Sequence, residues 1–294
     1  REEEKQEPME GHADALLEMR THFYLGNYQA AINDADRVNN LEEEVVAEKR
    51  VLVQRCYLGL GNHALVVSQI EDDAPEEMLV VRDLARFLSG DAGAVADIKA
   101  HLAEPSTSEL LSNMRAIAGA MANLEEGDLE EALKCASQCT WLEGKAIIVQ
   151  IFLELNRVDM AIKELAKMQR MDEDAVITQL TQAWAYLAVG GEKAVQAGYI
   201  FEELLEKHGQ TLQLLNGQAV SKMIQGHFAE AEPLLLMALE KAPNDKTTLI
   251  NLTVCYRHLN KPSESVERKI KQIRSLPGAH PWLASFDRHS DLFD

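Results

Sequence analysis

The sequence predicts an all-α fold in which about eight helical hairpins stack into a solenoid. Two observations support this prediction. A stretch of 34 residues, Leu212–Asp245, is followed by a second stretch of similar pattern that runs from Lys246 to Ala279. Glycine or asparagine also recurs along the chain at intervals near 34 residues. The alternation of apolar and polar residues that indicates strands is scarce, so a sheet is not expected.

The two copies carry residues of matching character at matching places. Ala231 corresponds to Val266, and Leu235 corresponds to Ile270. Small residues suit the points where the two helices of a hairpin cross closely, and larger apolar residues fill the space around them. Gly226 suits a left-handed residue at the end of the first helix. This is the pattern of the tetratricopeptide (TPR) repeat, so we expect a TPR-like right-handed solenoid.

Turn residues divide the whole chain into hairpins. The expected turn residues lie 29 to 36 residues apart and are Gly26, Gly61, Gly93, Gly127, Asn156, Gly190, Gly226 and Lys261. Asn156 can replace glycine because its short amide side chain tolerates the left-handed region. Pro233 falls inside the second helix of its hairpin, so we expect a kink or a late helix start there.

The two ends of the chain depart from the repeat. Residues 1–11 are charged and lack an apolar stripe, which predicts a disordered acidic tail. Residues 12–279 would form the solenoid. In residues 280–294, Trp282 and Phe286 are four residues apart, so we expect a short helix from about Pro281 that caps the array.

Charge and cysteine content limit the class of protein. The formal net charge is −19, which disfavours nucleic acid and anionic membranes as direct ligands because both require a cationic surface. No apolar run reaches the ~18 residues of a membrane span, and no signal peptide is visible. The four cysteines are too few and too scattered for a disulfide scaffold. We therefore expect a cytoplasmic protein.

One stretch is basic. Arg257–Arg274 holds six basic residues against Glu264 and Glu267. A solvated helix face is the simplest interpretation, and a contact for an acidic partner is the alternative.

Motifs for catalysis or cofactor binding are absent from the sequence. Gly190–Lys193 (GGEK) is not a phosphate-binding loop. Cys135 and Cys139 share a helix face, but no histidine or second cysteine pair lies near them in sequence to complete a metal site. Packed core thiols are the favoured interpretation. We expect no enzyme activity, no metal and no cofactor.

The inner face of the solenoid is the candidate binding surface, because the first helix of each TPR hairpin lines the concave side. The residues expected to point into it are largely apolar. The predicted partner-binding residues are Met114, Ile117, Met121, Leu124, Leu153, Ile177, Leu180, Trp184, Leu187, Val220, Met223, Ile250 and Val254. An open apolar groove promotes aggregation unless it is filled, so we expect a lasting partner with apolar side chains. Alternatively, the register differs by one position and some of these residues are ordinary core.

Several stretches carry a resemblance to a known family. They are Tyr24–Ala35, Lys163–Ala175, Thr178–Lys193, Leu214–Val220, Asn260–Val266 and His280–Phe286. In these stretches the chain resembles the epsilon subunit of coatomer, the COPI vesicle coat. The GGEK insertion adds to the resemblance because the ordinary TPR pattern does not require it.

The resemblance implies a non-catalytic structural subunit of the COPI coat, acting in Golgi-to-ER retrograde and intra-Golgi transport. It also implies that the C-terminal region of the alpha coatomer subunit is the partner and is held in the solenoid groove. The protein would then lie peripherally on Golgi membranes and COPI vesicles, through the coat alone.

Two other classes remain open. One is a TPR scaffold or co-chaperone that binds another apolar peptide. Co-chaperones of this kind clamp a terminal carboxylate with Lys and Asn, whereas this chain carries Met, Ile, Leu and Trp at the corresponding places. The other is an all-helical enzyme subunit, such as the alpha subunit of a prenyltransferase, which would need a catalytic partner.

Overall fold

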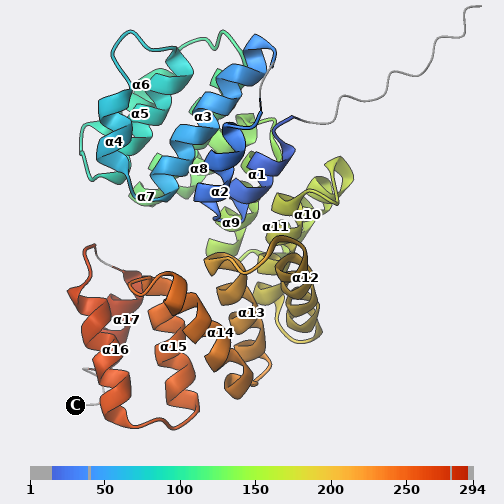
Figure 1. The fold of residues 1–294 in the computed structure, drawn as a ribbon, viewed down its shortest axis with the longest axis vertical. Coiled ribbons are helices and arrows are strands. Elements are labelled where there is room, and N and C mark those ends of the chain that lie inside the picture. The colour runs from blue at the N-terminus through green and yellow to red at the C-terminus, as the bar shows by residue number, and fades with distance from the viewer. Residues whose placement is uncertain (1–14, 39–40, 279, 291–294) are drawn as a thin grey trace, which may run out of the picture. The chain divides into compact units, whose positions relative to one another are not determined.

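The computed structural model describes residues 15–38, 41–278 and 280–290, and these residues form helices and loops without strands (Figure 1). Successive helices pair into hairpins joined by tight turns, which confirms the expected all-α, TPR-like fold. The chain divides into two compact units, with the boundary between Gly144 and Lys145. The shortest interval between expected turn residues, the 29 residues from Gly127 to Asn156, spans this boundary. The expected acidic tail, residues 1–11, lies outside the described residues.

The first unit contains four hairpins and the start of a fifth. Its helices are α1 (Leu17–Tyr24), α2 (Tyr28–Ala35), α3 (Glu43–Gly59), α4 (His63–Gln69), α5 (Glu76–Leu88), α6 (Ala94–Leu102), α7 (Glu109–Glu126) and α8 (Leu129–Gln138). The boundary between the units falls inside α9 (Leu142–Glu154).

The second unit continues the pattern and ends in a single helix. Its helices after α9 are α10 (Val158–Met171), α11 (Val176–Val189), α12 (Glu192–His208), α13 (Leu212–Ile224), α14 (Phe228–Lys241), α15 (Lys246–His258), α16 (Ser263–Ser275) and α17 (Pro281–Ser290). α17 begins at Pro281 as expected, and Trp282 stacks on Phe286 with ring centroids 5.0 Å apart.

Most of the expected turn residues have the left-handed backbone that the repeat requires, with φ between 55° and 82°. Two expected turn residues are wrong. The left-handed residues are Gly90 and Asn260, whereas Gly93 has φ −74°. Spacing alone does not separate Gly90 from Gly93. Lys261 was expected at this turn, but its neighbour Asn260 has the left-handed backbone, with φ 53°. The short amide side chain of Asn260 tolerates this conformation, as that of Asn156 does at φ 55°.

Pro233 neither delays the start of its helix nor breaks it. α14 begins at Phe228 and continues past Pro233 to Lys241. Proline lacks an N–H group, so the carbonyl of Ala229 receives no bond from it. Ala229 and Pro233 are both exposed, so water can satisfy this carbonyl.

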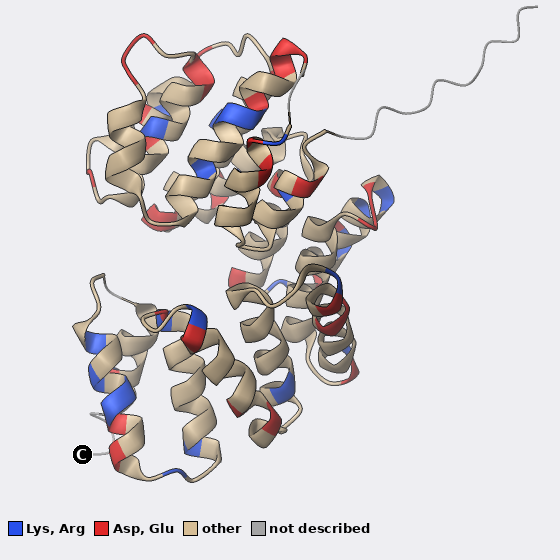
Figure 2. Cartoon of the chain, viewed as in Figure 1, with Lys and Arg blue, Asp and Glu red and all other residues tan. Residues whose placement is uncertain are grey.

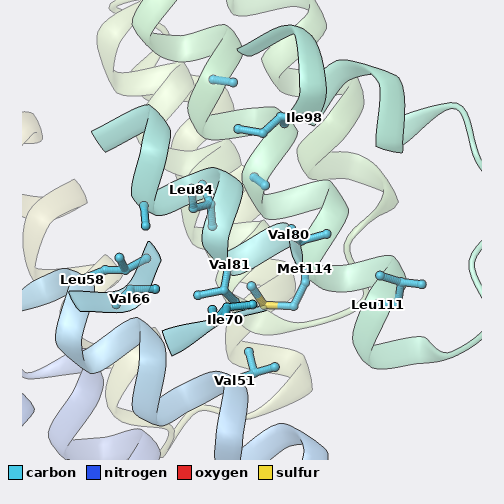
Figure 3. Close-up of a cluster of buried hydrophobic side chains, with 13 residues drawn as sticks. Val51, Leu58, Val66, Ile70, Val80, Val81, Leu84, Ile98, Leu111 and Met114 are labelled. Carbon is cyan, nitrogen blue, oxygen red and sulfur yellow. The ribbon is translucent and has the colours of Figure 1, made fainter. Parts of the chain in front are cut away.

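A continuous apolar core holds the first unit together. Figure 3 shows its buried side chains, in which Val80, Val81 and Leu84 of α5 pack with Met114 of α7. Leu111 lies at one end of the same cluster. The first helices α5 and α7 are therefore packed directly on one another.

The core of the second unit repeats from hairpin to hairpin. Ala219 of α13, Ala231 of α14 and Leu252 of α15 form one cluster and are fully buried. At the C-terminal end, Ile273 of α16 packs against Trp282 of α17. α17 therefore covers apolar surface that the last hairpin would otherwise expose, as a capping helix should.

Gly217 of α13 lies close to α12. A Cβ atom at this position would overlap the ring of Phe201, which is fully buried. Gly217→Ala should therefore destabilise the second unit, because overpacking costs about 1–3 kcal/mol and outweighs the ~1 kcal/mol gain in helix propensity. The free energy can be measured from urea unfolding followed by hydrogen exchange, which separates the two units. Gln218→Ala on the same helix is the control, and equal effects of the two changes would contradict the prediction.

A buried ion pair ties distant parts of the first unit together. Arg55 of α3 makes two hydrogen bonds to Glu143 in the first turn of α9, and one of them is 3.1 Å long. The Arg55 guanidinium also lies over the ring of Phe23, 4.7 Å from its centroid. Both charged side chains are largely buried. This pair therefore joins α1, α3 and the start of α9, which are far apart in sequence.

Arg55→Met or Glu143→Met alone should destabilise the first unit by about 3–5 kcal/mol, because each leaves an unpaired charge in a buried site. The double change should restore most of this loss, since two apolar side chains replace the pair. Urea unfolding followed by hydrogen exchange in α1, α3 and α9 measures both effects. If the double variant lost the sum of the stabilities lost by the two single variants, the ion pair would not be the cause of the destabilisation.

Candidate partner-binding surface

The first helices of the second unit form its inner face. Each first helix packs on the second helix of its own hairpin and also touches the first helix of the next hairpin, so that α11 meets α13 and α13 meets α15. Within the described residues, the second helices α12, α14 and α16 approach one another less closely. Helices on the concave side of a curved array are the more crowded ones. We call the side of α11, α13 and α15 that carries Trp184, Val220 and Val254 the inner face of the second unit.

One repeat position marks this face throughout the chain: the sixth residue before each left-handed turn residue. The residues at this position are Arg20, Arg55, Leu84, Met121, Gln150, Trp184, Val220 and Val254. Apart from Leu84, all of them are at least partly exposed. In the second unit, Trp184, Val220 and Val254 bring three successive apolar side chains to the inner face.

Seven of the thirteen predicted partner-binding residues are partly exposed. They are Met121, Leu124, Leu153, Trp184, Val220, Met223 and Val254. Met121 and Leu124 belong to α7 of the first unit, and the other five belong to the second. Their partial exposure means that apolar area is left for another molecule to cover.

The other six predicted residues are packed inside the chain. They are Met114, Ile117, Ile177, Leu180, Leu187 and Ile250. Met114 belongs to the core of the first unit, and Ile250 packs in the cluster that α17 closes. Neighbouring helices cover these side chains, so they do not lie on an open surface.

Trp184 is held in place by its own hairpin. Its indole meets the ring of Phe201 edge to face, with centroids 5.3 Å apart. Further along α11, the ammonium group of Lys193 lies over the ring of Tyr186, 4.1 Å from the ring centroid. The GGEK insertion, which supplies Lys193, therefore contributes to packing at the end of this hairpin. Trp184 presents a fixed apolar surface with little side-chain entropy to lose on binding.

In the first unit, charged groups occupy the equivalent position in two of the four hairpins, whereas Leu84 and Met121 occupy it in the other two. Arg20 donates to Glu48 at 2.8 Å, and Arg55 pairs with Glu143. Burial would lower the pKa of Arg55, but the carboxylate of Glu143 outweighs it and raises that pKa above its usual value. Burial, and then the Glu143 charge, raises the pKa of Tyr24 beside them.

These charged pairs were missed as a feature of the inner face. The signal that could have found them is the position of Arg20 and Arg55, each six residues before a turn glycine. Their charges are satisfied within the unit, whereas Val220 and Val254 of the second unit stay partly exposed.

The cysteines are buried thiols. Cys135 and Cys139 lie in or just after α8, and burial raises the pKa of both. Burial also raises the pKa of Cys56 to about 12, so its thiol stays protonated at neutral pH. Within the described ranges, no cluster of three or more His, Cys, Asp or Glu side chains could hold a metal ion. None of the described helices has the length and apolarity needed to cross a membrane.

Comparison with known proteins gives a consistent result. A family described as coatomer epsilon subunit matches residues 12–294. Coatomer subunit epsilon-1 of Oryza sativa is 44% identical, covering 88% of this chain and 89% of the relative. Coatomer subunit epsilon of Dictyostelium discoideum is 33% identical and covers 96% of this chain and 97% of the relative.

Solved structures with a similar fold are repeat proteins of low sequence identity. The Cut9–Hcn1 crystal structure has a TM-score of 0.63 at 11% identity, covering 92% of this chain and 54% of that one. A tetratricopeptide repeat protein from Parabacteroides merdae has a TM-score of 0.59 at 12% identity, covering 93% and 97%. These likenesses concern the fold alone, whereas the sequence comparisons establish the family. The chain belongs to the coatomer epsilon-subunit family, whose members are structural, non-catalytic subunits of the COPI vesicle coat.

Proposed function

We propose that this chain binds the C-terminal region of the alpha coatomer subunit on the inner face of its second unit. The observation that carries the proposal is the series Trp184, Val220 and Val254, three apolar side chains at equivalent positions of successive hairpins and all partly exposed. Met223 and Leu153 lie on first helices of the same unit and extend the apolar character. In the first unit, Met121 and Leu124 remain further candidates.

The chemistry of this face favours a lasting partner with apolar side chains. Burying apolar surface contributes ~25 cal/mol per Å², and only part of this remains after the costs of association. A short electrostatic contact would leave the apolar groups open to water. The basic residues that would clamp a terminal carboxylate are absent from the position that Trp184, Val220 and Val254 occupy.

The cellular role follows from the proposed partner. Bound to the alpha subunit, the chain would act in Golgi-to-ER retrograde and intra-Golgi transport. It would lie on Golgi membranes and COPI vesicles through the coat, with no lipid contact of its own.

Val220→Glu together with Val254→Glu should weaken the complex with the C-terminal region of the alpha subunit at least about a hundredfold, or ~2.7 kcal/mol, because two carboxylates would be buried without partners. The two residues are partly exposed in the free chain, so its folding should be retained. Titration calorimetry measures the affinity and circular dichroism the fold. We avoid Trp184 here because its ring packs on Phe201.

Tyr199→Glu is the matched control, because this side chain lies on α12 and is 65% exposed. It should leave the affinity unchanged. A failure of the unmodified chain to bind the alpha-subunit region would exclude this partner. A complex that tolerates both valine changes would place the binding surface elsewhere on the chain.

A further inference from the structure

The second half of α16 carries an unusual concentration of positive charge. Arg268, Lys269, Lys271 and Arg274 fall within seven residues that include no acidic residue, although the whole chain has a formal charge of −19. Figure 2 shows Lys and Arg gathered along the helix that Figure 1 labels α16. We call these four residues the α16 basic face.

The packing of α16 turns this face outward. Val266, Ile270 and Ile273 are the buried residues of the helix and fix its inner side. Arg268, Lys271 and Arg274 are exposed, and Lys269 is partly exposed at the edge of the buried side. The charges are therefore presented to solvent by a helix whose orientation the core determines.

Contacts within the chain neutralise only part of this charge. Arg268 reaches Glu264 at 3.5 Å, but both side chains are highly exposed, and such pairs within a helix contribute little. Arg274 pairs with Asp287 of α17. Neither Lys269 nor Lys271 forms an ion pair with any residue that the structure describes. The face therefore keeps a local positive field on an otherwise acidic protein.

The stability of the helix does not explain the whole cluster. Cations near a helix C-terminus interact favourably with the helix dipole, but this effect is confined to the last turn. Only Arg274 of the four is a basic residue of the last turn. Arg268, Lys269 and Lys271 lie earlier, where their mutual repulsion is unfavourable to the isolated helix.

The shape and setting of the face select the class of partner. A membrane or a nucleic acid is an extended anionic surface, and it would repel a chain of net charge −19. A short acidic protein segment can reach one helix without approaching the rest of the surface. We propose that the α16 basic face docks an acidic segment of another protein chain, separately from the apolar inner face of the second unit.

The test uses a fluorescent peptide of ten glutamates as the probe and the full chain as the receptor. Anisotropy should show binding at about 50 mM salt that weakens severalfold at about 200 mM, because salt screens exposed charges. Arg268→Glu with Lys271→Glu should weaken binding at least about tenfold. The matched control is Lys163→Glu with Arg170→Glu, two exposed cations of α10 that give the same change in net charge and should alter binding less than about twofold.

If both double variants weakened peptide binding equally, the proposal would be overturned, because the net charge of the chain would then explain the binding. Absence of binding by the unmodified chain would overturn it as well. So would stronger binding to vesicles that contain phosphatidylserine, if Arg268→Glu with Lys271→Glu removed that binding. Affinity for the alpha-subunit region should be unchanged in this variant, which keeps this test separate from that of the inner face.

Discussion

In four of the hairpins, the two helices cross closely at a small residue. Ala31, Ala132, Ala161 and Ala231 each lie five residues after a left-handed turn residue, and each is fully buried. A larger side chain at these points would push the helices apart. The crossing fixes which side of each first helix is covered by its hairpin. The sixth residue before the turn differs in chemistry from hairpin to hairpin, from Arg55 in α3 to Val220 in α13.

Six of the eight turn residues and the cap could be predicted because their causes are local. A left-handed residue demands glycine or asparagine, and Trp282 with Phe286 marks a helix beyond the last hairpin. The boundary at Gly144 and Lys145 has no such local cause, because it depends on how hairpins pack over long distances in the chain. Local rules also could not predict that α14 continues past Pro233, because this depends on whether the carbonyl of Ala229 is exposed to water.

The candidate site was predictable only in part, because sequence spacing gives the face of a helix but not what covers it. Met114 faces inward on α7, yet α5 packs directly on this side and buries it. Val220 occupies a comparable place on α13 and stays partly exposed, because α11 covers α13 less fully. The Arg55–Glu143 pair joins residues that no local pattern connects.

The same repeat position differs in chemistry between hairpins of the two units. In the first, Arg20 and Arg55 find carboxylates within the unit, so their charges require nothing from outside. In the second, Val220 and Val254 leave apolar area partly exposed. The α16 basic face adds a different kind of contact, because exposed charges govern the rate and orientation of an encounter more than its final affinity. A chain with both features can recruit one partner segment by charge while it holds another by burial.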